Sequence, residues 1–458
     1  MKIVVLNGSP KGMTSVTMQY VLFLRKKLPQ HDFTILNVCQ DIKKLDSDEQ
    51  VFREVIKTVA ESDGVLWAFP LYYMLVHGDY KRFIELVFAR GAGTAFQGKY
   101  AAVLTTSIHF FDHTAHEYLG AICDDLGMHC VGSYSAAMQD LLVEKERDRL
   151  LLFAGDFLHA IEERRATPRR FRPVVHDEFT YEPGEPTNKV ATLASNIIIV
   201  TDAEDPGGNL AKMTDRLQRC WEGAVPVINL RQIDIRGGCL GCCQCGLDNA
   251  CVYKDADDVQ QVYRKLMAAD ILILAGSVQD RYLSSRWKTF FDRGFFMNHV
   301  PVFAGKQIGY LVSGPLLQLA NLRQILEGYV ECQRANLAGI VSDECVSSAE
   351  LDRLLDGFAG RLIDFAAAGY LRPPTFLSVG GRKLFRDEIW ARLRFVFRRD
   401  HRYYRKNGLY DFPRRSFKTR ITDGLFTLLL LIPGFRREFR RRIREEMVKP
   451  LQKVVEKA

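Results

Sequence analysis

The chain carries the same series of apolar segments twice, and this internal repeat limits the fold more than any other feature. Five short runs rich in Val, Ile and Leu recur in the same order, with stretches between them that are long enough for helices. The paired runs are 2–7 and 196–201, 33–38 and 225–230, 63–69 and 270–276, 100–107 and 307–314, and 129–134 and 336–341. Continuous apolar strands that alternate with helices are typical of parallel sheets covered on both faces. The repeat therefore predicts two tandem α/β domains, each a doubly wound sheet of five parallel strands in the order 2-1-3-4-5.

Changes in composition indicate where the repeats begin and end. Residues 164–192 are rich in Pro, Arg and Glu and predict a linker, and a Pro-Pro pair after Arg372 marks a second boundary. We expect a first domain at 1–163, a second domain at 193–371 and a helical tail at 372–458. The offset between the copies grows from 194 residues at the first run to 207 at the third. The second copy therefore has an insertion of about a dozen residues after its second strand.

The net charge of +8 is unevenly distributed. Residues 371–458 contain 24 of the 63 Lys and Arg but 9 of the 55 Asp and Glu, so the tail is basic and the body mildly acidic.

The longest apolar run, 425–432, is far shorter than the ~20 residues of a membrane-spanning helix. The first residues predict a strand rather than a signal peptide, and the 11 cysteines are crowded rather than evenly spaced. We therefore expect a cytoplasmic protein.

Three loops of the first copy follow strands that end at the same edge of the predicted sheet. Residues 8–17 (GSPKGMTSVT) combine small residues, hydroxyls and Lys11 before a helix, a pattern that favours a phosphate group. This loop is neither a Walker A nor a G-x-G-x-x-G motif, and a plain strand–helix turn is the alternative. Residues 69–81 (FPLYYMLVHGDYK) predict a slot for a planar ring, or else a pair of core tyrosines. The third loop is 105–111 (TTSIHFF).

Taken together, these loops resemble those of the flavodoxin-like NAD(P)H-dependent FMN reductases. The resemblance covers residues 1 to about 160 and, more weakly, about 195 to 370. It implies FMN as cofactor, NAD(P)H as co-substrate and an electron acceptor that the sequence does not identify. By this resemblance the phosphate would be held by Ser9, Lys11, Ser15 and Thr17. The isoalloxazine would lie along Pro70, Leu71, Tyr72 and Tyr73, with Thr106, Ser107 and His109 near its polar edge.

The second copy differs from the first at these positions. Its first loop (201–209, TDAEDPGGN) places three carboxylates where a phosphate would bind, so we expect weak FMN binding or none. Its insertion contains Cys239, Cys242, Cys245 and Cys251, with Cys243 as a fifth thiol. Thiolates at this density suit an iron–sulfur cluster or zinc. The spacing resembles that of the iron–sulfur flavoproteins, which implies a [4Fe–4S] cluster, although FMN reductases without a cluster carry similar cysteines.

These differences are complementary, because one copy has the flavin loops and the other has the cysteines. If the copies pack as a pseudo-dimer, the flavin and the cysteines would form one composite centre.

The tail is amphipathic at 384–399, apolar at 426–432 and basic at 435–444. It predicts docking onto the body, onto an oligomer partner or onto an anionic membrane surface, and no segment matches a nucleic-acid-binding fold. An electron carrier that docks through its tail, or a structural domain that binds zinc, is the alternative to an enzyme.

Overall fold

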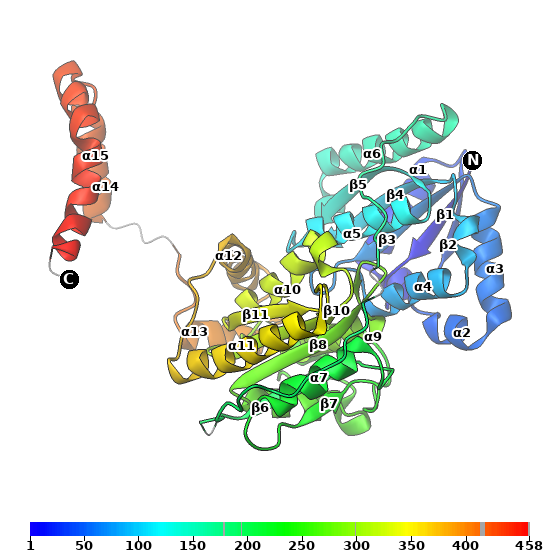
Figure 1. Ribbon diagram of the computed structural model, residues 1–458. Coiled ribbons are helices and arrows are strands. Elements are labelled where there is room, and N and C mark those ends of the chain that lie inside the picture. Colours follow the sequence, from blue (N-terminus) through cyan, green and yellow to red (C-terminus); the bar gives the residue numbers. More distant parts are fainter. Residues whose placement is uncertain (177–178, 194, 298, 413–416, 457–458) are drawn as a thin grey trace. The chain divides into compact units, whose positions relative to one another are not determined.

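The first half of the repeat forms a parallel sheet in the predicted order, β2-β1-β3-β4-β5 (Figure 1). The strands are β1 (Lys2–Asn7), β2 (Asp32–Leu36), β3 (Gly64–Pro70), β4 (Tyr100–Ser107) and β5 (His129–Ala137). The helices are α1 (Val16–Lys27), α2 (Ile42–Ser47), α3 (Glu49–Ala60), α4 (Gly78–Ala89), α5 (Asp112–Asp125) and α6 (Glu144–Glu162), with 3-10 turns η1 (Gly12–Thr14), η2 (Ala92–Ala95) and η3 (Asp140–Leu142). Strands β1, β3 and β4 are buried almost throughout, which explains their continuous apolar sequences.

The second half forms a sheet with the same topology, in the order β11-β10-β8-β6-β7. The strands are β6 (Ile197–Thr201), β7 (Val227–Asn229), β8 (Ile271–Gln279), β10 (Gln307–Ser313) and β11 (Asn336–Ser342). A sixth strand, β9 (Tyr282–Leu283), pairs antiparallel with β8 and has no counterpart in the first sheet or in the sequence prediction. The helices are α7 (Asn209–Arg219), α8 (Val259–Ala268), α9 (Ser285–Arg293), α10 (Ala320–Cys332) and α11 (Ser348–Ala367), with 3-10 turns η4 (Gln244–Gly246), η5 (Lys254–Ala256), η6 (Gly294–Met297) and η7 (Leu316–Gln318).

The tail is helical, as predicted. Its helices are α12 (Phe376–Ala391), α13 (Arg398–Lys406), α14 (Phe417–Leu429) and α15 (Pro433–Val455). The computed structural model describes residues 1–176, 179–193, 195–297, 299–412 and 417–456, and it divides into two units, Met1–Tyr403 and Tyr404–Ala458. Within the described residues, no helix has the length and hydropathy needed to cross a membrane.

The two copies pack against each other through α4 and α9, which occupy equivalent positions in the two halves (Figure 1). The Glu85 carboxylate near the end of α4 accepts a hydrogen bond from the backbone N–H of Ser285 at the start of α9 (2.6 Å). Reciprocally, the Asp292 carboxylate near the end of α9 accepts one from the N–H of Gly78 at the start of α4 (2.7 Å). Each residue lies 207 positions from its counterpart. The tandem copies therefore form an intramolecular pseudo-dimer with a shared hydrophobic core.

Candidate functional site

The loops that follow β1, β3 and β4 lie at one edge of the first sheet, because its parallel strands all end there. Two contacts join them. The Oγ1 atoms of Thr17 and Thr106 lie 2.6 Å apart, and the Leu71 N–H donates to the Thr106 carbonyl at 3.1 Å. Both threonines are buried. The structure thus brings the first turn of α1, the end of β3 and the end of β4 into contact.

The loop after β1 ends as the N-terminus of α1. Ser15 is the N-cap, and its hydroxyl accepts from the Met18 N–H at 3.2 Å. Ser9, Ser15 and Thr17 are buried, whereas Lys11 is exposed. The first N–H groups of a helix have no acceptor within the helix, and the helix dipole adds positive potential there. Together with hydroxyls and one lysine, this arrangement fits a phosphate group.

The loop after β3 is a tight turn at the junction of the two copies. Tyr72 and Leu75 exchange two backbone hydrogen bonds of 2.9 Å, and Tyr73 and Met74 between them have left-handed backbone angles (φ 36° and 65°). The Tyr73 ring packs edge-on against Phe295 of the second copy, with centroids 6.3 Å apart. A strained turn of this kind is common at functional sites. Pro70, at the end of β3, and Leu71 are half-buried beside this turn.

The loop after β4 presents one exposed histidine at the same edge. Thr106 and Ser107 are buried, and the Ser107 hydroxyl accepts from the His109 N–H at 2.8 Å. His109 is half-exposed, has a left-handed backbone (φ 64°), and its Nδ1 lies 3.0 Å from the Asp112 carboxylate. The side chains predicted to lie near a flavin's polar edge are therefore close to one another in space.

The equivalent edge of the second copy is filled by its own carboxylates. Asp202 replaces Gly8 of the first copy; it is buried and accepts a hydrogen bond from the Ser284 hydroxyl. Burial raises the pKa of Asp202. Asp343 accepts from the hydroxyl of Ser313 (2.7 Å), from the N–H of Gly314 (2.8 Å) and from the side chain of Asn209 (2.9 Å). Donors that could otherwise hold an anion are thus engaged, which supports the expectation of weak FMN binding in this copy.

The insertion after β7 folds so that its five cysteines surround one cavity. Cys239, Cys242, Cys243, Cys245 and Cys251 line it, and Phe295, Phe296 and Arg293 form part of its wall. Burial raises the pKa of Cys239 to about 12 and raises that of Cys245 as well, so these sulfurs stay protonated unless a metal stabilises their thiolates. All eleven cysteines are free thiols. The four predicted ligands therefore converge in space as well as in sequence.

The spacing of these sulfurs can be compared with that of the other candidate metal ligands. Within the described part of the chain, the one group of three ligand atoms that all lie within 4.8 Å of one another is Cys39, His77 and Asp79. Among the described residues, no three sulfurs of the insertion are mutually within that distance. A set of thiolates fits either zinc or an iron–sulfur cluster.

The cysteine insertion of the second copy lies directly against the flavin loops of the first. Gly241 has φ +61°, and a Cβ at this position would lie 2.3 Å from Tyr72 Oη and 3.3 Å from Lys11 Cε. His77, at the N-cap of α4, has its Nε2 2.9 Å from the carbonyl oxygen of Cys239. The structure thus places the predicted cysteine ligands beside Lys11 and Tyr72, as the composite-centre hypothesis requires.

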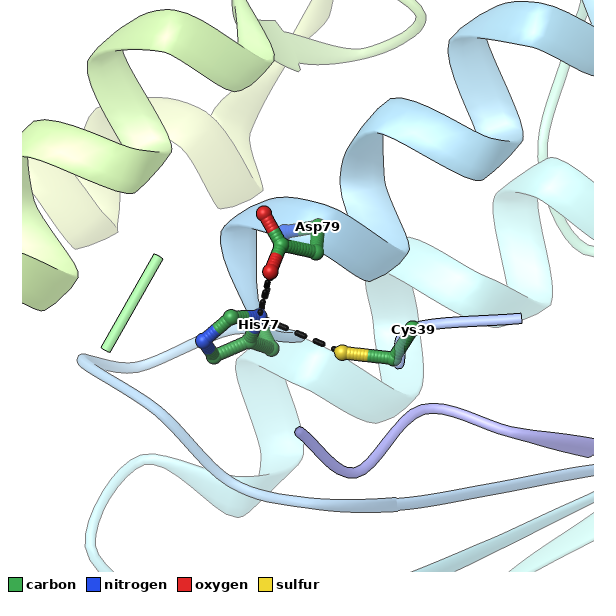
Figure 2. A group of neighbouring side chains, drawn as sticks. All are labelled: Cys39, His77 and Asp79. Atoms are coloured by element: carbon green, nitrogen blue, oxygen red, sulfur yellow. Dashed lines mark hydrogen bonds and ion pairs between the residues drawn. The ribbon is translucent and has the colours of Figure 1, made fainter. Parts of the chain in front are cut away.

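His77 was not singled out by its sequence, and the structure makes it the link between the two halves of this centre. Figure 2 shows Cys39, His77 and Asp79 grouped at the start of α4. His77 Nδ1 accepts from the Asp79 N–H at 3.1 Å and lies 3.3 Å from Cys39 Sγ. Because Nδ1 is an acceptor, the proton is on Nε2, which donates to the Cys239 carbonyl. The Cys39 thiol and the Asp79 N–H thus both lie within hydrogen-bond distance of His77 Nδ1.

The segment between α12 and α13 of the tail contacts the cysteine insertion, and both helices pack on the body. A Cβ at Gly246 would lie 2.1 Å from the Val396 carbonyl oxygen, so the tail and the insertion are in close contact. Phe385 of α12 packs on Phe110 with ring centroids 4.6 Å apart, and Asp400 of α13 lies 2.7 Å from His299 Nδ1. Up to Tyr403, the tail thus packs onto the body of its own chain.

The sheet order and the loops at its carboxyl edge define a flavodoxin-like α/β protein. Residues 1–141 and 196–339 match the family described as NADPH-dependent FMN reductase. These segments make up more than half of the chain, so the protein belongs to that family and is an NAD(P)H-dependent FMN oxidoreductase. The two separate matches also confirm the tandem duplication. The search of curated proteins returned no match.

Three solved structures illustrate the similarity. The flavoenzyme NAD(P)H:(acceptor) oxidoreductase of Paracoccus denitrificans is 22% identical, with 35% of this chain and 97% of that chain covered and a TM-score of 0.29. The NAD(P)H:quinone oxidoreductase of Methanothermobacter marburgensis is 14% identical (37% and 98% covered, TM-score 0.28). An FMN-dependent NADH-azoreductase of Bacillus anthracis is 12% identical (35% and 96% covered, TM-score 0.26).

Proposed function

We propose that the protein is an iron–sulfur flavoprotein in which the first copy binds FMN and the cysteine insertion of the second copy holds a [4Fe–4S] cluster. It would take electrons from NAD(P)H and deliver them to a small-molecule or protein acceptor. One observation carries the proposal: the cysteine insertion packs on Lys11, Tyr72 and His77, at the edge of the sheet where the flavin loops meet.

The residues of the first copy would bind and orient the flavin. Ser9, Ser15 and Thr17 would donate hydroxyl hydrogen bonds to its phosphate, and Lys11 would neutralise part of the charge. Pro70 to Tyr73 would flank the ring, while Thr106, Ser107 and His109 would offer polar contacts at its edge. When bound, FMN supplies the hydride-accepting chemistry, so no side chain of this protein needs to act as a nucleophile or general base.

The residues of the second copy would bind the cluster. Cys239, Cys242, Cys245 and Cys251 would supply the four thiolates, and Phe295 and Phe296 would limit the access of water to them. When bound, the cluster supplies one-electron transfer, at a potential set by burial and by hydrogen bonds near the sulfurs. His77 would orient the first ligand through the Cys239 carbonyl.

Metal content distinguishes this proposal from its alternatives. Anaerobically purified protein should contain about four irons and four acid-labile sulfides per chain and absorb broadly near ~400 nm. Cys242→Ser should lose most of the iron, whereas Cys243→Ser, the matched control from the same insertion, should retain it. Zinc in place of iron would support a structural metal site. The absence of both metals would support a set of thiols without a cluster.

Reduction of the bound flavin separates an enzyme from an electron carrier. The FMN-loaded protein should lose its flavin absorbance within seconds when NADPH or NADH is added anaerobically. Reduction by a partner protein alone, with no response to either nucleotide, would contradict the proposed reaction and favour a carrier.

The unit Tyr404–Ala458 would place this reaction at an anionic membrane surface. It contains 15 Lys and Arg against 6 Asp and Glu. Six large apolar side chains at or near the turn between α14 and α15 are exposed, and the arginines that follow are exposed as well: Ile421, Leu425, Phe426, Leu428, Leu431, Ile432, Arg436, Arg437 and Arg440. Apolar residues beside a basic cluster are typical of helices that lie in the lipid headgroup region.

Vesicle binding tests this assignment. The full chain should sediment with phosphatidylglycerol vesicles and not with phosphatidylcholine vesicles, and salt should weaken the binding. Replacing Arg436, Arg437 and Arg440 by Gln should abolish it, whereas replacing the exposed Arg53, Arg149 and Arg323 of the body by Gln should not. Equal binding to both kinds of vesicle, or equal effects of the two triple variants, would exclude an electrostatic membrane site in this unit.

A further inference from the structure

Two cysteines of the first copy, outside the insertion, lie near the amino ends of the strands of its sheet, away from the predicted flavin loops. Cys123 is in the last turn of α5, and Cys130 is the second residue of β5. Both are buried, and each side chain lies near enough to the other to shift its pKa. The Arg170 Nη2 atom donates to Cys130 Sγ at 3.0 Å. The site therefore combines two neighbouring thiols and one permanent positive charge.

The local backbone holds these groups in place. The Met128 N–H donates to the Cys123 carbonyl at 2.9 Å, which keeps the turn between α5 and β5 tight. The Asp124 carboxylate accepts from the N–H groups of Arg170 and Phe171, both at 2.8 Å, and so anchors the chain segment that carries the guanidinium. Arg170 itself is exposed, so a surface side chain contacts the buried Cys130.

The environment gives the two sulfurs different roles. The hydrogen bond from Cys123 and the Arg170 guanidinium lower the pKa of Cys130 to about 7, although burial acts in the opposite direction. The pKa of Cys123 is raised well above its ordinary value by its hydrogen bond to Cys130 and by burial. Cys130 is thus the thiolate of the pair, and Cys123 is its protonated partner.

A contact with arginine alone does not produce this effect. Cys220 also accepts from an arginine, Arg216 Nη1, at 2.8 Å. The Asp356 carboxylate lies 2.8 Å from the same guanidinium, and burial raises the pKa of Cys220 to about 12. Cys220 therefore serves as an internal comparison for Cys130.

We propose that Cys130 and Cys123 form a peroxide-reactive pair that closes to a disulfide. The Cys130 thiolate attacks hydrogen peroxide, the S–O bond forms as the O–O bond breaks, and the leaving hydroxide takes up a proton to become water. The Cys123 sulfur then attacks the Cys130 sulfenic acid, the S–S bond forms as the S–O bond breaks, and a second water leaves. Two thiols are oxidised by two electrons, and one peroxide is reduced to two waters.

Peptide mapping of the full chain tests the pair directly. After one equivalent of hydrogen peroxide and alkylation of the remaining thiols, mass spectrometry should find a disulfide between Cys123 and Cys130, with Cys220 still alkylated as a thiol. In Cys123→Ser, Cys130 should instead be trapped as a sulfenic acid by dimedone. Cys130 and Cys123 both recovered as thiols would overturn the proposal, as would oxidation of Cys220 at the same rate.

Substitution of the arginine tests the origin of the reactivity. Arg170→Gln should raise the pKa of Cys130, whereas the Cys123 hydrogen bond, the larger cause of the lowered value, remains. A complete return to the ordinary pKa of about 8.5 would lower the thiolate fraction at pH 7 from about one half to about 3% and sets the upper limit of the effect. The higher nucleophilicity of the more basic thiolate offsets part of this loss, so alkylation of Cys130 should slow by up to about threefold. Arg172→Gln removes the same charge two residues away and should leave the rate unchanged. Equal rates in both variants would refute the role of Arg170. The site takes no part in the proposed flavin reaction, so either result leaves that proposal intact.

Discussion

Removing the Glu85 carboxylate should destabilise the junction between the two copies. Glu85 is 1% exposed and accepts hydrogen bonds from Lys81 Nζ (3.0 Å), the Ser285 N–H (2.6 Å) and the Ser285 hydroxyl (2.5 Å). In Glu85→Ala, Lys81 remains fully buried, and Asp280 at 3.8 Å is its nearest acidic neighbour. The variant therefore leaves the Ser285 N–H without its acceptor and leaves the buried Lys81 charge with the more distant Asp280 alone.

The size of the effect follows from this loss. Breaking a buried ion pair by removing one partner costs about 3–5 kcal/mol. The unit Met1–Tyr403 has 403 residues, and about 2.1 cal/mol/K per residue gives an unfolding entropy of about 0.85 kcal/mol/K. The melting temperature should then fall by about 4–6 °C. Glu85→Gln, which keeps an acceptor for Ser285, should give a smaller decrease.

The effect should also depend on pH. Burial alone would raise the pKa of Glu85, but the Lys81 charge and the Ser285 hydrogen bonds outweigh it, so the pKa is lowered. A carboxylate with a lowered folded-state pKa stabilises the fold fully above its unfolded pKa, about 4.3. This contribution is lost as the pH falls through the folded-state value. The difference in melting temperature between wild type and Glu85→Ala should therefore be complete at pH 7 and shrink below about pH 4.

Thermal unfolding followed by circular dichroism measures these differences. Glu61→Ala is the matched control, because Glu61 pairs with Lys57 on the surface at 3.8 Å. Such a pair contributes at most about 1 kcal/mol, so its loss should shift the melting temperature by about 1 °C or less. If Glu85→Ala melts within that same margin of the wild type, the argument from the buried ion pair is refuted.

Three further predictions concern the predicted flavin site, a partly buried histidine and the cysteine insertion. Lys11→Ala should raise the Kd for FMN about tenfold through the loss of one charged contact, measured by quenching of flavin fluorescence, whereas Lys26→Ala should leave it unchanged. Burial lowers the pKa of His116 to about 4, so the neutral ring stabilises the fold above about pH 6.5 and about 3 kcal/mol is lost as the pH falls toward 4. His116→Gln should therefore melt with a weaker dependence on pH in this range. Gly241→Val should displace the cysteine insertion from Tyr72, because its side chain would overlap the phenol oxygen, and the purified variant should contain less iron than the wild type.

Features that depend on neighbouring residues or on a regular pattern of apolar residues could be predicted from the sequence. Strands β1, β3 and β4 are buried on both faces, so their continuous apolar runs predicted a parallel sheet and its order. A loop of small and hydroxylated residues before α1 indicated an anion site, since the N-terminus of a helix provides the same N–H donors in any protein. The short spacing of the four cysteines likewise brings their sulfurs to one place.

The tertiary structure decided how these parts meet. The pairing of α4 with α9, the position of Gly241 against Tyr72 and the hydrogen bond from His77 to Cys239 join residues that are about 160 or more positions apart. No periodicity or local propensity encodes such distances, because they depend on how two complete domains pack. The sequence by itself thus determined a duplicated flavodoxin-like protein, with a predicted flavin loop in one copy and a group of closely spaced cysteines in the other. Only the packing of the copies shows that these two features lie side by side. Their contact depends on the shapes of both domain surfaces, which neither stretch of sequence specifies alone.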